Sequence, residues 1–459
     1  MWMTRKPYHM TLAAVLAASV TLAGCSGGDK KTEGTGGSGK SGETVTITHY
    51  TQDAPDKAYV EQLIPEFEKK FPNIKVKVVK APYEQFESKL QSMVAAGNSP
   101  DVTSHWGDAG FAEYYNKGLV RDMTDLLKED NFKASDYGIS DHLMDIYKVN
   151  GKTYGIPVYS YVSVLVYNKD MFDKAGIPYP PSDYEDKSWT FEKMQEYAKK
   201  LTKISKNLND TQYGIDWGWS ERDMRPLYFG ASTYPEETFT KNGGNPEVSK
   251  FNSPEVKDAY RTMFDMMHKD KSMIDPVTTK AVAGEGGDPF AAGKVAMSVG
   301  GAWLLAGSND FGFKVGVAAV PAGKNEKARD VLFVDPLFIL KDSKHPKEAL
   351  EWIKFQLSKE TQEKAVELSG GTPPANSQAG EKYFSYFQNI DPKDLKNVYE
   401  GGLKYGVESW NHMIPGYAEL NTIIKNEMEP IENGKKSVDE VMPDLEKHIN
   451  DVLAKRQKK

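Results

Sequence analysis

Val45-Thr46-Ile47-Thr48 begins a stretch, residues 44–103, in which strand and helix patterns alternate, and this stretch decides the fold class. These four β-branched residues predict a strand, and residues 74–79 and 101–103 predict two more. Between the strands, hydrophobic residues recur at helical spacing, first as Val60, Leu63, Ile64 and Phe67 and then as Phe86, Leu90, Met93 and Val94. A β-α-β-α-β order predicts a parallel sheet with right-handed crossovers, and therefore an α/β fold.

The alternation starts again farther along the chain, which indicates a second lobe. Residues 162–167 predict a strand, and Ser188-Trp189-Thr190 and Ser253-Pro254 each offer an N-cap to a helix. From Pro346 onward the sequence is mostly helical, and Trp352 is assigned to the core face of the first helix there. The 459 residues exceed the roughly 250 to 300 at which one core stops growing. We therefore expect two α/β lobes and a helical C-terminal part.

The N-terminal residues predict an export signal that ends at the one cysteine of the chain. Arg5 and Lys6 precede an apolar stretch, and Leu22-Ala23-Gly24-Cys25 resembles a bacterial lipobox. The resemblance implies a signal peptide over residues 1–24, a lipid on Cys25, and a protein held on the extracytoplasmic face of the cell membrane. Residues 25–43 would carry this lipid and form a flexible linker rich in Gly and Ser. The linker contains a phosphate-loop pattern, residues 34–41, but no strand precedes it, so we expect no nucleotide site there.

The composition excludes several kinds of partner. The formal net charge is −7 and the Lys and Arg residues form no basic stripe, so we expect no nucleic-acid partner. A lipidated Cys25 leaves no thiol for a disulfide or a thiolate metal site. Beyond the signal, no apolar run reaches the roughly 18 to 20 residues that span a bilayer. We expect no cofactor and no bound metal ion.

Short motifs follow one another along residues 44–459 in a characteristic order. They include Phe67-Glu68-Lys69-Lys70-Phe71-Pro72-Asn73-Ile74, Ser99-Pro100-Asp101-Val102, Phe290-Ala291-Ala292-Gly293-Lys294-Val295-Ala296-Met297, and Gly300-Gly301-Ala302-Trp303. With these motifs, the chain resembles the extracytoplasmic solute-binding proteins of ABC importers, in the carbohydrate-binding group to which maltose-binding protein belongs. The resemblance implies a monomer that is not an enzyme, captures an oligosaccharide, and delivers it to the transmembrane permease of an ABC transporter.

The same resemblance implies the type II fold of periplasmic binding proteins, with two lobes, a hinge and an interlobe cleft. Residues 44–158 plus 332–372 would form the N-terminal lobe, and residues 162–328 plus 373–459 the C-terminal lobe. Hinges are expected near residues 157–161 and 330–336. A ligand that contacts both lobes would then draw them together.

The candidate site residues follow predicted strands, because ligands bind beyond the carboxyl ends of the strands of an open α/β sheet. A sugar offers an apolar face to an aromatic ring and hydroxyl groups to a carboxylate, so Trp, Tyr and Asp are the side chains sought. By similarity, Asp108 corresponds to a sugar-binding carboxylate of the family and Trp303 to a ligand position. The expected ligand-binding residues are Tyr50, Gln52, Trp106, Asp108, Tyr161, Asp216, Trp217, Trp303 and Trp410.

Other functions remain open on the sequence alone. A polyamine would require several carboxylates, and a glycerol phosphate would require a basic anchor such as Arg222 or Arg225. A secreted glycoside hydrolase would also be aromatic and acidic, but it needs two carboxyl groups across one glycosidic bond, and no hydrolase motif is recognised. Release of reducing ends from oligosaccharides distinguishes the hydrolase from a binding protein.

Overall fold

The computed structural model describes residues 44–54, 57–106, 109–217, 221–235, 238, 244–284, 287–323 and 330–457. Cys25 and Asp108 lie outside these ranges, as do the signal and linker expected over residues 1–43. No helix in the described ranges is long and apolar enough to cross a membrane. The same ranges contain no group of three or more His, Cys, Asp or Glu residues that is arranged to bind a metal ion.

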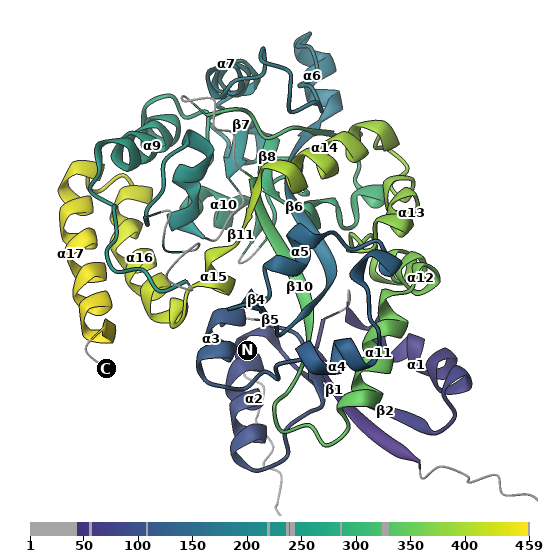
Figure 1. Ribbon diagram of the computed structural model, residues 1–459. Helices are drawn as coiled ribbons and strands as arrows, with labels where there is room; N and C mark the ends of the chain where they lie inside the picture. Colours follow the sequence, from purple (N-terminus) through teal and green to yellow (C-terminus); the bar gives the residue numbers. More distant parts are fainter. Residues whose placement is uncertain are drawn as a thin grey trace, which may run out of the picture. The chain divides into compact units, whose positions relative to one another are not determined.

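In the described ranges, strands form a nine-stranded mixed sheet in the order β2-β1-β3-β10-β6-β8-β7, with β9 paired to β6 and β11 to β10. Figure 1 labels most of these strands. A separate ribbon is made by β4 and β5. The strands are β1 (Val45–Gln52), β2 (Ile74–Ala81), β3 (Val102–Thr103), β4 (Lys148–Val149), β5 (Lys152–Thr153), β6 (Ile156–Asn168), β7 (Tyr213–Trp217), β8 (Val295–Gly301), β9 (Val315–Ala318), β10 (Asp330–Ile339) and β11 (Gly406–Glu408).

The helices connect and cover these strands. They are α1 (Tyr59–Lys70), α2 (Phe86–Ala95), α3 (Phe111–Asn116), α4 (Thr124–Glu129), α5 (Asp141–Asp145), α6 (Lys169–Ala175), α7 (Phe191–Leu201), α9 (Pro254–Phe264), α10 (Pro276–Ala283), α11 (Pro346–Leu357), α12 (Lys359–Ser369), α13 (Gly380–Phe384), α14 (Pro392–Tyr405), α15 (Trp410–Met413), α16 (Tyr417–Glu432) and α17 (Val438–Gln457).

The part of the fold around β1, β2 and β3 is called the N-terminal lobe here. β1 pairs in parallel with β2, from Val45 opposite Ile74 to Gln52 opposite Ala81, and in parallel with β3. Helices α1 and α2 supply the crossovers between these strands. The predicted β-α-β-α-β unit with its parallel sheet is therefore confirmed.

The part around β7, β8 and β9 is called the C-terminal lobe. β7 runs parallel to β8, and β6 pairs antiparallel with both β8 and β9. The expected caps are present: the hydroxyl of Thr190 accepts from the backbone N–H of Lys193 at the start of α7, and that of Ser253 accepts from Val256 at the start of α9. Helix α17 packs against both α16 and α9, as Figure 1 shows. The two-lobe α/β fold with a helical C-terminal part is thus confirmed.

Strands β6 and β10 extend from one lobe into the other. They pair antiparallel over residues 156–162 of β6 and 332–337 of β10, with a register shift between Asp335 and Pro336. At one end β10 pairs with β3 of the N-terminal lobe, and toward its start it pairs with β11. A continuous pair of strands therefore connects the two lobes directly.

The core of the N-terminal lobe is completed by α11, far along the sequence from β1 and α1. Trp352 of α11 has no exposed surface, and its ring lies edge-on to Phe67 of α1 with centroids 4.8 Å apart. Its indole N–H donates to Nδ1 of the buried His49 of β1, at 2.9 Å. The assignment of Trp352 to the core is therefore confirmed.

Candidate functional site

A cavity of about 1130 Å³, called the Trp303 cavity here, lies beside the ends of β7 and β8. Its wall combines aromatic, carboxyl, guanidinium and amide groups, which suits a polar organic ligand better than a hydrocarbon. The only residue from the N-terminal lobe among those that line it in the described structure is Tyr83. The other polar or aromatic lining residues include Asp216, Trp217, Glu221, Arg222, Arg225, Asp288, Trp303, Asn411, Tyr417, Asn421 and Glu432.

Trp303 offers an aromatic surface to this cavity. It follows the end of β8, and 41% of its surface is exposed, whereas four of the six described Trp residues are buried. The ring packs against that of Phe333, with centroids 4.7 Å apart, and against that of Tyr161, with centroids 5.9 Å apart. It also covers Gly301, where an added Cβ would come within 2.1 Å of the ring. Glycine at 301 therefore lets the ring lie close to the backbone.

Asp216 provides a carboxyl group at the end of β7. It pairs across the sheet with Ser298 of β8, whose hydroxyl lies 3.5 Å from its Oδ2. Burial and the nearby carboxyl of Asp288 raise the pKa of Asp216 to about 7, against an opposing effect of Arg225. Asp216 can therefore change between donor and acceptor near neutral pH.

The neighbouring Trp217 is mostly internal. Only 5% of its surface is exposed, and its ring lies edge-on to Tyr228 at 4.8 Å. Its indole N–H has no hydrogen-bond partner among the described residues. Trp217 thus exposes little of its ring, and its indole N–H is itself buried.

Two guanidinium groups of the cavity wall share one carboxylate. Arg222 binds Glu432 with two hydrogen bonds of 2.8 and 2.9 Å, and Arg225 donates to the same carboxylate at 3.0 Å. Burial favours the neutral form of Glu432, but the two arginines outweigh it and hold its pKa below the ordinary value. These two guanidinium groups are thus engaged with the protein itself, and the other basic side chains that line the cavity among the described residues are Lys280 and Lys425.

A second row of residues links Trp303 to the N-terminal lobe. The ammonium of Lys57 lies 4.4 Å from the ring centre of Trp106 and 5.8 Å from that of Tyr161, which in turn contacts Trp303. Lys57 also forms an ion pair of 3.8 Å with Asp335 of β10. The structure therefore brings Trp106, Tyr161 and Trp303 together, although Trp106 and Tyr161 do not line the Trp303 cavity.

Two expected site residues lie in the core. Tyr50 has no exposed surface, stacks on Phe86 and donates to its carbonyl at 2.9 Å, so its side chain has no face available to a ligand. Trp410 is 3% exposed and lies edge-on to Tyr234 at 5.2 Å, although the adjacent Asn411 lines the cavity. Gln52 is half-buried at the end of β1.

Several residues of the site were not among those expected from the sequence. Tyr83 lies just past the carboxyl end of β2 and is 44% exposed, so the rule that selected residues after β1 and β3 would also have selected it. No sequence pattern would have selected Lys57 or Asp288, because neither lies in an α-helix or a strand. Lys57 is in the connection between β1 and α1, and Asp288 in the connection between α10 and β8.

Comparison with known proteins identifies the family. Residues 51–363 match the family described as bacterial extracellular solute-binding protein, which is more than half of the chain. The protein belongs to this family. The solute-binding protein is 27% identical to the arabinooligosaccharide-binding protein of Bacillus subtilis, over 82% of this chain and 84% of that one. It is 25% identical to the multiple sugar-binding protein of Streptococcus mutans, over 72% and 74% of the two chains.

Solved structures share the fold of this solute-binding protein. An ABC substrate-binding protein from Listeria monocytogenes, in complex with cycloalternan, is 26% identical with a TM-score of 0.74, and the match covers 90% of this chain and 100% of that one. A maltose-bound protein of T. maritima is 20% identical, with a TM-score of 0.68 and coverage of 89% and 100%. The latter shows likeness of fold alone.

Proposed function

We propose that this solute-binding protein captures a neutral oligosaccharide in the Trp303 cavity and delivers it to the permease of an ABC transporter. The observation that carries the proposal is the exposed ring of Trp303 beside the carboxyl of Asp216 and amide groups such as that of Asn411. A pyranose needs this combination, because its C–H face covers an aromatic ring while each buried hydroxyl left without a partner costs about 1 to 3 kcal/mol.

The size of the cavity supports an oligosaccharide over a single sugar. Its volume of about 1130 Å³ is above the roughly 300 to 1,000 Å³ usual for small-molecule sites. The names of the relatives point the same way, since one binds arabinooligosaccharides and a structural neighbour was solved with cycloalternan.

A charged ligand is less well matched. Arg222 and Arg225, the two guanidinium groups that could anchor a glycerol phosphate in the cavity, already bind Glu432. A polyamine would require ionised carboxylates, whereas the pKa of Asp216 is raised to about 7 and that of Asp288 is also raised, in both cases chiefly by burial.

Ligand binding is proposed to close the two lobes. Tyr83 stands on the N-terminal side of the cavity and Trp303 on the C-terminal side, so a sugar contacting both gains its full contact only when the lobes approach. The proposed hinges are residues 157–161 of β6 and 330–336 of β10, with lobes of residues 44–158 plus 332–372 and 162–328 plus 373–459. We also propose a monomer without enzymatic activity, anchored through lipidated Cys25 on the extracytoplasmic face of the cell membrane.

Calorimetry against a panel of neutral oligosaccharides tests the function. Maltotriose, mannotriose, arabinotriose and cycloalternan are suitable, with glucose, spermidine and glycerol 3-phosphate as comparisons. We expect at least one oligosaccharide to bind with a Kd near micromolar, or about −8 kcal/mol, without release of reducing ends. Binding of spermidine or glycerol phosphate alone would reject a sugar ligand, and new reducing ends would indicate a hydrolase.

A further inference from the structure

The backbone of Val334, in the middle of β10, is held by side chains on the edge where no strand of the described ranges pairs with it. Along β10, β11 pairs with residues 330–332 and β3 pairs with residues 338–339, and Val334 lies between these pairings. Its carbonyl accepts from the hydroxyl of Tyr147 and from Nε2 of His105, the latter at 3.2 Å. Its N–H donates to the carboxyl of Glu408, at 3.1 Å to the nearer oxygen. Both lone pairs of the Val334 carbonyl oxygen and the Val334 N–H are therefore engaged in hydrogen bonds.

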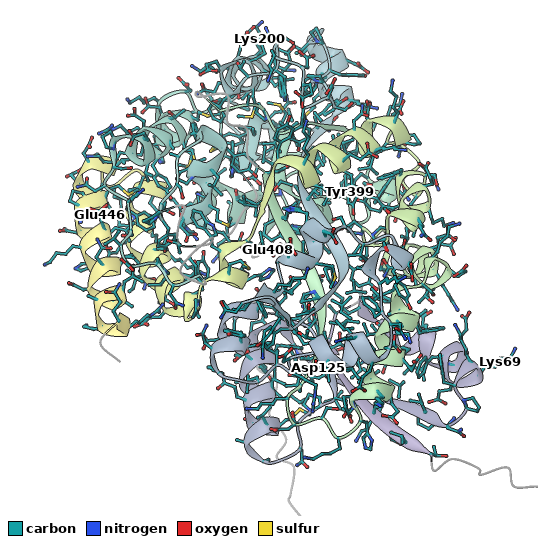
Figure 2. The ribbon with its side chains drawn as sticks, in the orientation of Figure 1. Lys69, Asp125, Lys200, Tyr399, Glu408 and Glu446 are labelled. Carbon is teal, nitrogen blue, oxygen red and sulfur yellow. The ribbon has the colours of Figure 1, made fainter. Side chains whose placement is uncertain are left out.

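His105 is fixed from its other side by the C-terminal part of the chain. Its ring stacks on that of His412 with centroids 3.8 Å apart, and Nδ1 of His412 bonds to Glu408. We call His105, Tyr147, Glu408 and His412 the Val334 cluster. Figure 2 labels Glu408, which lies where the two lobes meet. Gly110 packs against the backbone of His412 so closely that an added Cβ would lie 2.1 Å from its Cα.

The Val334 cluster is buried, and this burial favours the neutral form of each of its titratable groups. Burial, with a contribution from His412, lowers the pKa of His105 well below its ordinary value, and burial lowers that of His412 to about 3. Burial raises the pKa of Glu408 well above its ordinary value. Because a carbonyl can only accept, His105 carries its proton on Nε2. Burial, Glu408 and Asp335 raise the pKa of Tyr147 well above its ordinary value, and Asp335 is the ion-pair partner of Lys57.

Consecutive residues connect the cluster to the row of Trp106, Tyr161 and Trp303, of which only Trp303 lines the cavity. His105 is followed by Trp106, and Val334 is followed by Asp335. Lys57 joins these two, since its ammonium lies 3.8 Å from the carboxylate of Asp335 and 4.4 Å from the ring centre of Trp106. The segment that carries Trp106 is thus tied to β10 by a hydrogen bond from His105 and by the ion pair of Lys57.

We propose that His105 is a positioning residue for the sugar site, which acts by holding the Trp106 segment of the N-terminal lobe to Val334 at the hinge. The proposal rests on the proposed function as far as sugar affinity is concerned. The placement of Trp106 itself is independent of any ligand. When β10 bends between its pairings with β11 and β3, the side-chain hydrogen bonds at Val334 keep Trp106 in a constant position relative to Asp335 and Tyr161.

The test measures the ¹⁹F resonance of Trp106 in the full chain, without and with sugar. The protein is labelled with 5-fluorotryptophan, and the ¹⁹F resonance of Trp106 is assigned with Trp106→Phe. We expect His105→Leu to shift or broaden this resonance, because the donor to Val334 is lost, and His105→Gln to restore it, because its amide N–H replaces Nε2. Tyr147→Phe, which removes only a hydroxyl, should have a smaller effect in the same direction and serves if His105→Leu does not fold.

His49→Leu is the matched control, since His49 is also a buried histidine and lies in the N-terminal core against Trp352. It should lower the melting temperature and leave the Trp106 resonance in place. In calorimetry with maltotriose, mannotriose, arabinotriose and cycloalternan, His105→Leu should weaken any binding by roughly three- to ten-fold and His105→Gln by less. An unmoved Trp106 resonance in both His105→Leu and Tyr147→Phe would overturn the proposal. If no panel sugar binds the wild type, the proposed function fails while the ¹⁹F result still decides the role of His105.

Discussion

Replacing Trp303 by Ala should weaken oligosaccharide binding by about 1 to 3 kcal/mol. A Trp side chain carries about 150 to 250 Å² of surface, and 41% exposure leaves roughly 60 to 100 Å² that a sugar can cover. At about 25 cal/mol per Å², covering this surface contributes about 1.5 to 2.5 kcal/mol, and covering one face contributes about half of that. A stacked ring adds about 0.5 to 1.5 kcal/mol beyond the area effect.

Isothermal titration with the tightest-binding oligosaccharide of the panel measures this loss, which corresponds to roughly 5- to 150-fold in Kd. Trp352→Ala is the control, because Trp352 has no exposed surface and lies in the core of the N-terminal lobe. That substitution should lower the free energy of unfolding by about 3 to 5 kcal/mol and leave the affinity of the folded fraction unchanged. A Kd for Trp303→Ala within twofold of the wild type would refute the role of Trp303 as a stacking surface.

Four further outcomes are expected. Tyr83→Ala should weaken oligosaccharide binding about 3- to 10-fold in calorimetry with little change in melting temperature, because Tyr83 is 44% exposed; equal affinities would remove it from the site. Burial raises the pKa of Asp216 to about 7, so the folded protein holds a proton that the unfolded chain has released, and stability falls as pH rises from about 4 to 7. Asp216→Asn should reduce the difference in stability between pH 5 and pH 8 in urea unfolding. Part of the difference should remain, because burial also raises the pKa of Asp223 and that of Asp330 to about 7. An unchanged difference would contradict the raised pKa of Asp216. Small-angle scattering should show a smaller radius of gyration at saturating sugar, and an unchanged radius would reject hinge closure. Cys25→Ser should abolish incorporation of labelled fatty acid in cells, whereas label in the variant would contradict the lipobox.

The secondary structure and the order of the lobes could be predicted because their signals are local. The cap and proline at Ser253 and Pro254 mark the start of α9, and the β-branched run at Val45 marks β1. These patterns depend on neighbours within one or two turns of the chain. The family motif that ends in Trp303 also predicted an aromatic ring just after β8, and this ring is exposed.

The side chains of the site could be predicted only in part, because burial is decided by residues distant in sequence. Tyr50 satisfies the rule for a residue near the end of a strand, yet its hydroxyl bonds to Phe86 and its ring stacks there. Nothing near Tyr50 in the sequence indicates that α2 will cover it. In the same way, Lys57 and His105 acquire their contacts from β10 and α15, which follow more than 200 residues later along the chain.

The contact between Trp352 and His49 has a consequence for the order in which the protein folds. The two residues are 303 positions apart, and the bond between them joins α11 to the first strand. A ribosome that has made β1, β2 and β3 has therefore not yet made the helix that covers their core. The core of the N-terminal lobe therefore stays incompletely packed until the central part of the C-terminal lobe has been synthesised. During that interval the apolar surface of the N-terminal lobe is exposed to chaperones.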